Sequence, residues 1–378
     1  MSAAAGGAAG ASHRAADSRA ADSRAADLPA GPAAVSAAAQ AIHDSAVIVD
    51  GCSFFFAGYG DLLRASGLTA VNFTVALPMD DSLQAAQRIK EYYATVSRDP
   101  GSRIVRTPDD IRRCKAEGTF GVIIGCQNSR LIGTDLAWLE VFHTLGLRTL
   151  QLTYNERNFV GDGCLEPNDA GLSHFGKRVV RAANELGLTI DLAHAGVRTT
   201  LEAIELSEKP CVISHSGVTA LVPGPRSYSD EVIAAIAAKG GVFGVTTFPN
   251  CNWRGGPTRP SFDDYLEALE HAIAVAGIDH VGYGSDYVAK IGAYPQWVID
   301  YLSDQYAPYR DGKPSRAGLA DVLGGIDIHD EQLAGFAGTH NLPRLTAALL
   351  ERGYSEEDVK KVHGENFMRV FEQTWVAA

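Results

Sequence analysis

Two histidines and one aspartate stand at or just after the ends of short apolar runs in the chain. They are His194, His215 and Asp286, and the runs that they follow cover residues 188–191, 211–214 and 281–284. Imidazole nitrogens bind divalent metals, and a carboxylate beside the ion can accept a proton from water. The set therefore indicates a metal-dependent hydrolase. For any single histidine, a capping or core role is the competing interpretation, and spacing alone leaves both open.

The scaffold for these residues shows in the pattern of the whole chain, where apolar runs alternate with amphipathic stretches from Val35 onward. The candidate strands are Ala46–Asp50, Ala70–Val75, Gly121–Gly125, Thr149–Leu152, Leu188–Asp191, Cys211–Ser214, Gly241–Thr246 and Val281–Gly284. The candidate helices include Asp81–Ser97, Phe175–Leu186, Thr199–Ser207 and Phe262–Ala276, and a helical C-terminal region follows with Asn341–Arg352 and Glu356–Trp375. Buried parallel strands have continuous apolar sequences, and helices between them are typical of repeated βα units.

Eight strands alternating with helices predict an α/β fold of the (β/α)8 TIM-barrel type. In such a barrel the functional site lies at the C-terminal ends of the strands, which is where His194, His215 and Asp286 stand. An open, doubly wound sheet is the structural alternative. It is disfavoured because no Gly-x-Gly-x-x-Gly motif follows the first run.

The first 34 residues differ from the rest of the chain. They are almost all Ala, Gly, Ser, Arg and Asp, and an Arg-Ala-Ala-Asp unit recurs between Arg14 and Asp27. Without large apolar side chains, such a segment cannot bury enough surface to offset the entropy lost on ordering. We expect residues 1–34 to be a disordered tail and residues 35–378 to form a single barrel domain.

Composition limits the partners and the compartment. The formal net charge of −12 repels phosphate backbones, so nucleic acid and anionic membranes are poor partners, and a small-molecule substrate is expected. The chain has six cysteines without a Cys-x-x-Cys pair, and no apolar run of signal-peptide or membrane-span length is visible. Reduced thiols in the cytoplasm are therefore expected. Trp253, Tyr287, Tyr294 and Trp297 could stack on a substrate or lie at the interface of a homodimer.

A set of ordered motifs resembles the membrane (renal) dipeptidase family. The motifs cover Gln151–Asn155, Gly161–Cys164, Gly171–Gly176, Asp191–His194, Ile213–Ser216, Pro225–Arg226, Gly240–Val245, Val281–Asp286 and Gly364–Phe367. Each motif is weak by itself, but their order and spacing hold from about Ala46 to Trp375. The resemblance implies an amidohydrolase-type barrel, and the better-known members of the family are zinc enzymes that cleave dipeptides.

The resemblance also implies roles for individual residues. His194 and His215 match a pair of zinc ligands, and Asp286 matches the carboxylate that acts as general acid and base. Arg226 matches the arginine that binds the substrate carboxylate, a bidentate task that suits guanidinium, and Asn155 is assigned to the same substrate site. Tyr154 stands where the family has a histidine that polarises the substrate, and a phenol can donate a hydrogen bond to an oxyanion.

The chain departs from the family at the other metal position. Members with two metals have a His-x-Asp after the first strand, where this chain has Cys52 and Phe54, and a bridging glutamate where it has Gln127. Phe54 has no ligand atom, and a neutral amide cannot hold two dications together. Cys52 could bind zinc as a thiolate, but a small buried thiol is the expected role. We therefore expect one zinc ion per chain, and we expect Cys52→Ser to leave it in place.

Three functions remain open at this point. The first is a metal-dependent hydrolase that acts on small dipeptide-like amides. The second is non-peptide chemistry, as a lyase, isomerase or hydrolase, on a small amino or quaternary-amine acid in the same pocket. The third is a non-catalytic ligand-binding homologue. Metal content separates the third function from the first two.

Overall fold

The structure is a computed structural model that describes residues 35–53, 60–255, 260–286, 333–336 and 339–376. The predicted tail 1–34 lies outside the described residues, as do Phe54, Tyr287, Tyr294 and Trp297. Within the described part of the chain, no helix is both long and apolar enough to cross a membrane.

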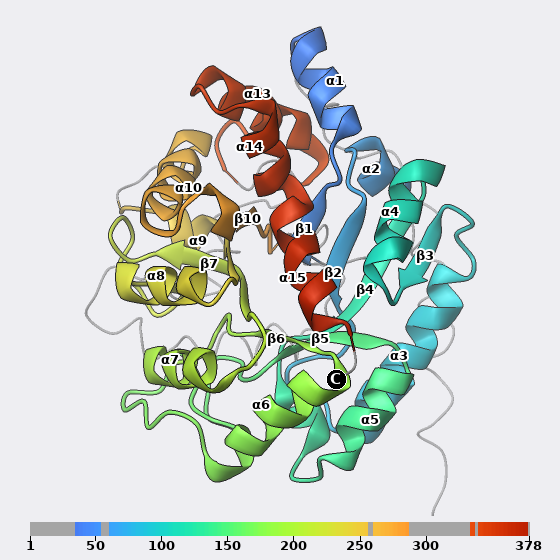
Figure 1. The fold of residues 1–378 in the computed structure, drawn as a ribbon, viewed down its shortest axis with the longest axis vertical. Coiled ribbons are helices and arrows are strands. Elements are labelled where there is room, and N and C mark those ends of the chain that lie inside the picture. Colours follow the sequence, from blue (N-terminus) through green and yellow to red (C-terminus); the bar gives the residue numbers. More distant parts are fainter. Residues whose placement is uncertain (1–34, 54–59, 256–259, 287–332, 337–338, 377–378) are drawn as a thin grey trace, which may run out of the picture.

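A ring of parallel strands forms the centre of the molecule (Figure 1). Its strands neighbour one another in the order β1-β2-β4-β5-β6-β7-β9-β10, while β3 pairs with β4 and β8 pairs with β7, all in parallel. The strands are β1 Val49–Ser53, β2 Ala70–Thr74, β3 Ser102–Val105, β4 Phe120–Cys126, β5 Leu147–Gln151, β6 Thr189–Asp191, β7 Val212–Val218, β8 Ser227–Tyr228, β9 Val242–Val245 and β10 Val281–Tyr283. The predicted TIM barrel is confirmed.

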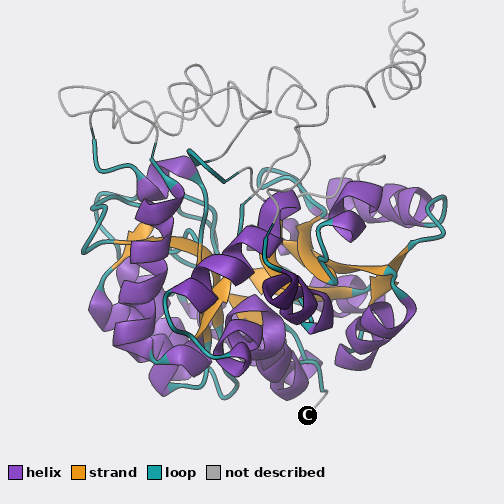
Figure 2. Ribbon diagram, turned by 90° about the horizontal axis from the view of Figure 1, so that it is seen from above, coloured by secondary structure: helices purple, strands orange, loops and turns teal. Residues whose placement is uncertain are grey.

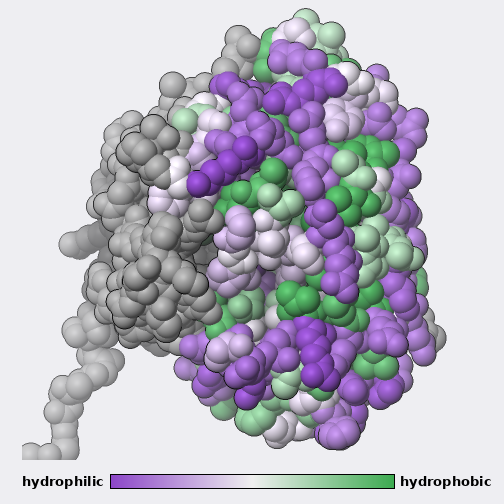
Figure 3. Space-filling view, turned by 90° about the vertical axis from the view of Figure 1, so that its left-hand side faces the viewer, coloured by the Kyte–Doolittle hydropathy of each residue, from purple (hydrophilic) through white to green (hydrophobic). Residues whose placement is uncertain are grey.

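Helices surround the strands, as the view in Figure 2 shows. They are α1 Ala37–Ser45, α2 Gly60–Ala65, α3 Ser82–Val96, α4 Pro108–Glu117, α5 Ala137–Thr144, α6 His174–Leu186, α7 Val197–Leu206, α8 Asp230–Ala238, α9 Pro249–Asn252, α10 Phe262–Ala276, α13 Leu342–Glu351, α14 Glu356–Lys360 and α15 Asn366–Thr374. One π-helical turn, Lys361–Glu365, joins α14 to α15. Several starts are set by local sequence: Asp81 and Ser261 each cap a helix through a capping box. On the face that carries α8 and α10, hydrophilic and hydrophobic residues are mixed (Figure 3).

The boundaries of the first strand differ from the prediction. β1 begins at Val49 and runs to Ser53, three residues beyond the predicted end at Asp50. The apolar run ends at Asp50, so the sequence carries no signal that pairing with β2 continues. Cys52 therefore lies within a buried strand rather than in the loop after it. The short strands β3 and β8 were not predicted, because β3 has few apolar residues and β8 has only two residues.

The C-terminal helix α15 covers the N-terminal end of the barrel. Its Phe367 and Phe371 form a hydrophobic cluster with Val49, Val212 and Val242, which are the first residues of β1, β7 and β9. In Figure 1, α15 crosses the centre of the ring of strands. The opposite end of the barrel, where the strands finish, is therefore the end that can hold a site.

The barrel closes between β1 and β10 by hydrogen bonds beyond the end of β10. The Asp286 backbone N–H donates to the Cys52 carbonyl oxygen at 2.8 Å. The Ser285 backbone N–H donates to the Asp50 carboxylate at 2.8 Å. The seam thus joins the two chain segments that carry Cys52 and Asp286.

Candidate metal centre

Backbone conformation singles out three residues at the C-terminal mouth of the barrel. Asn155, His194 and Asp286 have φ of 57°, 63° and 49°, and among the described residues they are the non-glycine residues with positive φ. A left-handed conformation costs a non-glycine residue about 1 kcal/mol or more, and such strain tends to concentrate at functional sites. All three belong to the set that the sequence predicted.

A buried aspartate and serine hold His215 in place, and we call this pair the Asp191–Ser214 clamp. The Asp191 carboxylate accepts hydrogen bonds from the Ser214 backbone N–H at 3.0 Å, from its hydroxyl at 2.5 Å and from the Ala193 N–H at 3.1 Å. Ser214 Oγ also lies 2.7 Å from His215 Nδ1. Since the hydroxyl proton goes to Asp191, the serine oxygen accepts from His215 Nδ1–H. His215 Nε2 therefore carries a free lone pair.

His194 is held in the same tautomer by a different partner. Its Nδ1 lies 2.7 Å from Asn155 Oδ1, which can only accept, so Nδ1 carries the proton and Nε2 the lone pair. The ring of Tyr154 stacks on the His194 ring with a centroid distance of 4.3 Å. Asn155 is fully buried, and its side-chain oxygen is directed at His194.

The two Nε2 atoms of His194 and His215 face each other at 3.0 Å. Two lone pairs at this distance repel each other unless a proton or a metal ion lies between them. A proton would make one ring a buried imidazolium, and burial together with the charge of Arg226 lowers the pKa of both histidines well below its usual value. The donor set therefore fits a divalent metal.

A second aspartate and serine repeat this arrangement at the seam of the barrel, and we call them the Asp50–Ser285 clamp. The Asp50 carboxylate accepts from the Ser285 N–H at 2.8 Å, from the Ser285 hydroxyl at 2.5 Å and from the Cys52 N–H at 3.2 Å. Thr339 adds a longer hydrogen bond at 3.4 Å. This clamp fixes Cys52 on one segment and Asp286, the neighbour of Ser285, on the other.

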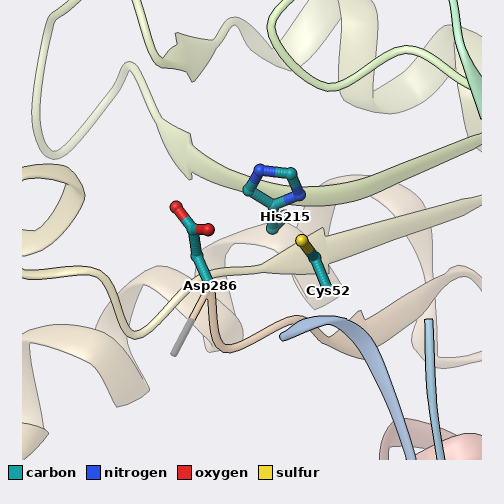
Figure 4. A group of neighbouring side chains, drawn as sticks. All are labelled: Cys52, His215 and Asp286. Atoms are coloured by element: carbon teal, nitrogen blue, oxygen red, sulfur yellow. The ribbon is translucent and has the colours of Figure 1, made fainter. Parts of the chain in front are cut away.

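Cys52, His215 and Asp286 converge on one space (Figure 4), with one ligand atom from each lying within 4.8 Å of the others. Burial raises the pKa of Asp286 to about 6, against the opposing effect of Arg226. Gln127 Nε2 donates a hydrogen bond to Cys52 Sγ at 2.9 Å. Cys52 and Gln127, the two described positions at which the sequence analysis expects lost metal ligands, thus touch each other.

The structure brings most of the predicted site residues together. Arg226 joins them between β7 and β8, where its guanidinium donates to the His215 carbonyl oxygen at 3.4 Å. Phe54 lies outside the described residues. The four clamp residues were not predicted as functional, although a signal existed: each aspartate ends an apolar run, and each serine directly precedes a site residue. Buried carboxylates are rare unless they are paired.

Comparisons with known proteins identify relatives of this chain. The family model described as membrane dipeptidase, peptidase family M19, matches residues 61–302 and 317–378. Dipeptidase tcpJ of Claviceps purpurea is 27% identical over 76% of this chain and 57% of its own length. An uncharacterized dipeptidase of Schizosaccharomyces pombe is 31% identical over 47% of this chain and 44% of its own length. The chain thus spans roughly half the length of these curated relatives.

Solved structures with a similar fold include an amidohydrolase and a metallopeptidase. An amidohydrolase from Pseudomonas aeruginosa has a TM-score of 0.79 and 31% identity, and the match covers 89% of this chain and 99% of that one. A metallopeptidase from Rhodobacter sphaeroides, liganded with a phosphinate mimic of L-Ala-D-Ala, has a TM-score of 0.68 at 22% identity over 87% of this chain and 99% of that one, which shows the shared fold. M19 metallopeptidases are metal-dependent. With a family model that matches most of its length, this chain belongs to the membrane dipeptidase family, peptidase family M19.

Proposed function

We propose that this chain is a metal-dependent hydrolase of small dipeptide-like amides, with one zinc ion per chain. The observation that carries the proposal is the pair of buried imidazoles whose unprotonated Nε2 atoms face each other at 3.0 Å. The dipeptidase names of the curated relatives support the substrate class. The alternative of a non-catalytic homologue is separated from this proposal by the metal content of the purified chain.

The number of ions follows from the donors available. His215 Nδ1 is occupied by Ser214, so its single free lone pair can bind one ion. Gln127 offers a neutral amide, and its nitrogen is already directed at Cys52. A second dication would therefore lack both a shared imidazole and a bridging carboxylate. We propose a single ion at His194 and His215.

Each remaining residue has a role toward the substrate or the ion. When bound, zinc would supply Lewis-acid activation of water and of the scissile carbonyl. Asp286 would take the proton from the attacking water, and Tyr154 would donate a hydrogen bond to the carbonyl oxygen. Arg226 would bind the substrate carboxylate. For Asn155, which the sequence assigned to substrate binding, we propose the positioning of His194 instead.

Metal analysis of the purified chain, followed by a dipeptide panel, tests the proposal. We expect about one zinc ion per chain and hydrolysis of at least one dipeptide, abolished by a chelator and restored by zinc. N-acylated amino acids belong in the panel, since one structural relative is described more broadly as an amidohydrolase. Small quaternary-amine acids belong there as well, because they test the non-peptide alternative. Turnover of the amine acids alone would favour the non-peptide alternative. A protein without metal would contradict the proposal.

The role of Arg226 has its own test. Arg226→Lys keeps the charge but loses the planar fork that matches a carboxylate. We expect KM for a free dipeptide to rise about tenfold, because a bidentate charged hydrogen bond is worth on the order of 1.5–3 kcal/mol. The matching dipeptide amide, which lacks that carboxylate, should show little further loss. An equal rise in KM for both substrates would remove Arg226 from carboxylate binding.

We also propose a reducing compartment, consistent with the cytoplasm. All six cysteines are free, and five of them are buried. The homodimer stays a prediction, which sedimentation of the purified protein would test.

A further inference from the structure

His215 belongs to two donor groups at once. Its Nε2 lies 3.0 Å from His194 Nε2, and one of its ring nitrogens lies within 4.8 Å of ligand atoms of Cys52 and Asp286. Since Nδ1 is held by Ser214, Nε2 is the ring nitrogen left to bind an ion, and one lone pair binds one ion. Ligand atoms around a tetrahedral zinc ion lie about 3–4 Å apart. Cys52 Sγ lies within 4.8 Å of a ring nitrogen of His215, but the set of mutually close ligand atoms does not include His194, so the side chains must draw together when an ion binds.

In the metal-free chain, burial and the charges of Asp286, Asp50 and Asp191 raise the pKa of the Cys52 thiol well above its usual value, so a thiolate there requires a bound cation. Gln127 Nε2 donates a hydrogen bond to the sulfur at 2.9 Å, and such a donor stabilises negative charge on the atom that it faces. A glutamate at position 127 would instead place a carboxylate against the thiolate. Cys52 is only 2% exposed, on a strand whose backbone is fixed by the Asp50–Ser285 clamp. The changes at positions 52 and 127 are thus chemically matched to each other.

The balance of charge points the same way. Two neutral imidazoles bring no negative charge directly to the ion, and Arg226 adds positive charge close by. The carboxylates of Asp50 and Asp191 are occupied by the serine and backbone donors of their clamps. A thiolate supplies one negative charge directly at the ion, so Asp286 need not serve as a ligand and can stay available for proton transfer.

We propose that Cys52 Sγ is the third protein ligand of the ion bound by His194 and His215, with Gln127 as the hydrogen-bond donor to the thiolate. The proposal rests on the proposed function and replaces the expectation that Cys52 is an inert buried thiol. When the ion binds, the thiol proton is released to solvent. Three protein ligands leave the fourth position open for substrate or water, beside Asp286. A sulfur ligand also favours zinc, cobalt or cadmium over magnesium.

Cobalt substitution of the full chain tests this ligand directly, because cobalt(II) bound to a thiolate has an intense near-ultraviolet charge-transfer band. The chain is stripped with a chelator, titrated with Co²⁺, and compared with Cys52→Ser and Cys52→His. Cys211→Ser is the matched control, since Cys211 is also 2% exposed but precedes β7 at the covered end of the barrel. Circular dichroism verifies that every variant is folded.

We expect the band in the wild type and in Cys211→Ser, and its loss in both Cys52 variants. Cys52→Ser should bind Co²⁺ at least about 100-fold more weakly, because even the loss of an outer partner of a metal ligand costs 10–100-fold. Cys52→His should recover much of the affinity without the band, which separates ligation from misfolding. Tight binding without the band in the wild type would overturn the Cys52 proposal and leave the hydrolase intact. Failure of the wild type to bind Co²⁺ or Zn²⁺ would overturn both.

Discussion

The two clamps at the mouth of the barrel share one design but hold different chemistry. In each, the carboxylate of a strand aspartate accepts hydrogen bonds from the backbone N–H and the hydroxyl of a serine on a neighbouring segment. The Asp191–Ser214 clamp holds His215, whereas the Asp50–Ser285 clamp holds Cys52 and Asp286. His215, which the sequence resemblance assigns to zinc, thus lies at one clamp, while Cys52, where the resemblance implies a replaced ligand, lies at the other. The same arrangement of aspartate and serine can therefore hold the backbone while the side chains beside it differ.

The clamps also differ in what they control. Ser214 Oγ continues to His215 Nδ1 at 2.7 Å, so the first clamp sets the tautomer of a ring. The second clamp has no ring to orient, and Ser285 Oγ instead lies 3.2 Å from the Cys52 carbonyl oxygen. The first clamp should therefore affect metal binding most, and the second should affect closure of the barrel most.

The largest effect is expected at His215, the residue shared by both donor groups. His215→Ala should lose the ion and lower kcat/KM by about a thousandfold or more, because Lewis-acid activation contributes several kcal/mol and each step of about 1.4 kcal/mol is tenfold. Metal analysis and dipeptide assays measure both. His174→Ala, on the exposed start of α6, is the control and should change neither. Retained metal and activity in His215→Ala would end the shared-ligand interpretation.

The next effect separates the two clamps. Asp191→Asn puts an amide where the carboxylate accepts the Ser214 hydroxyl, so the serine no longer fixes His215. We expect metal affinity to fall roughly 10–100-fold, as for other outer partners of metal-bound histidines. Asp50→Asn should weaken metal binding less, which competition with a chromophoric chelator can measure. A greater loss of affinity in Asp50→Asn would reverse the assignment of the two clamps.

For the stability of the metal-free protein, we expect the Asp50–Ser285 clamp to matter more than the Asp191–Ser214 clamp. Asp50 is buried and accepts hydrogen bonds from both sides of the barrel seam, from Cys52 on β1 and from Ser285 after β10. An amide in its place leaves donors facing a donor, so Asp50→Asn should lower the free energy of unfolding of the metal-free protein by about 1–3 kcal/mol. Denaturant unfolding measures this, with Asp61→Asn on α2 as an exposed control. An unchanged midpoint would show that the seam does not depend on the clamp.

The smallest effect is expected at Gln127. Gln127→Glu restores the family's residue, but Cys52 still occupies the strand-one position, so the stoichiometry should stay at one ion per chain. Affinity should fall by only a few fold, since the lost hydrogen bond to sulfur is worth about 1 kcal/mol. Metal analysis after dialysis measures the stoichiometry. Two ions in this variant would mean that the β1 side of the mouth can still bind a metal by itself.

Much of the fold could be predicted because its signals are local. Helix α10 has the predicted bounds, and its start is set by a capping box between Ser261 and Asp264. The eight barrel strands were found as apolar runs, since strands buried on both faces leave little room for polar residues. β3, which pairs with β4 off the path of the barrel, escaped prediction because it is short and has few apolar residues.

The candidate site was predictable only in part. His194, His215 and Asp286 could be placed at the mouth because parallel barrel strands end on the same side. The tautomers of the two histidines could not be predicted, since they depend on Ser214 and Asn155 at specific distances. Nor does any sequence pattern encode the left-handed backbone at these positions.

By itself, the sequence determined the barrel, the order of its strands and the residue types available at its mouth. Only the tertiary structure decided the environment of Cys52. Its contact with Gln127 joins positions 75 residues apart, and the bond between Ser285 and Asp50 spans 235 residues. The first contact needs the ends of β1 and β4 to converge at the mouth, and the second forms only when the barrel closes and brings the last strand against the first. Because β1 extends to Ser53, Cys52 is held within the strand, and its sulfur lies within 4.8 Å of a ring nitrogen of His215.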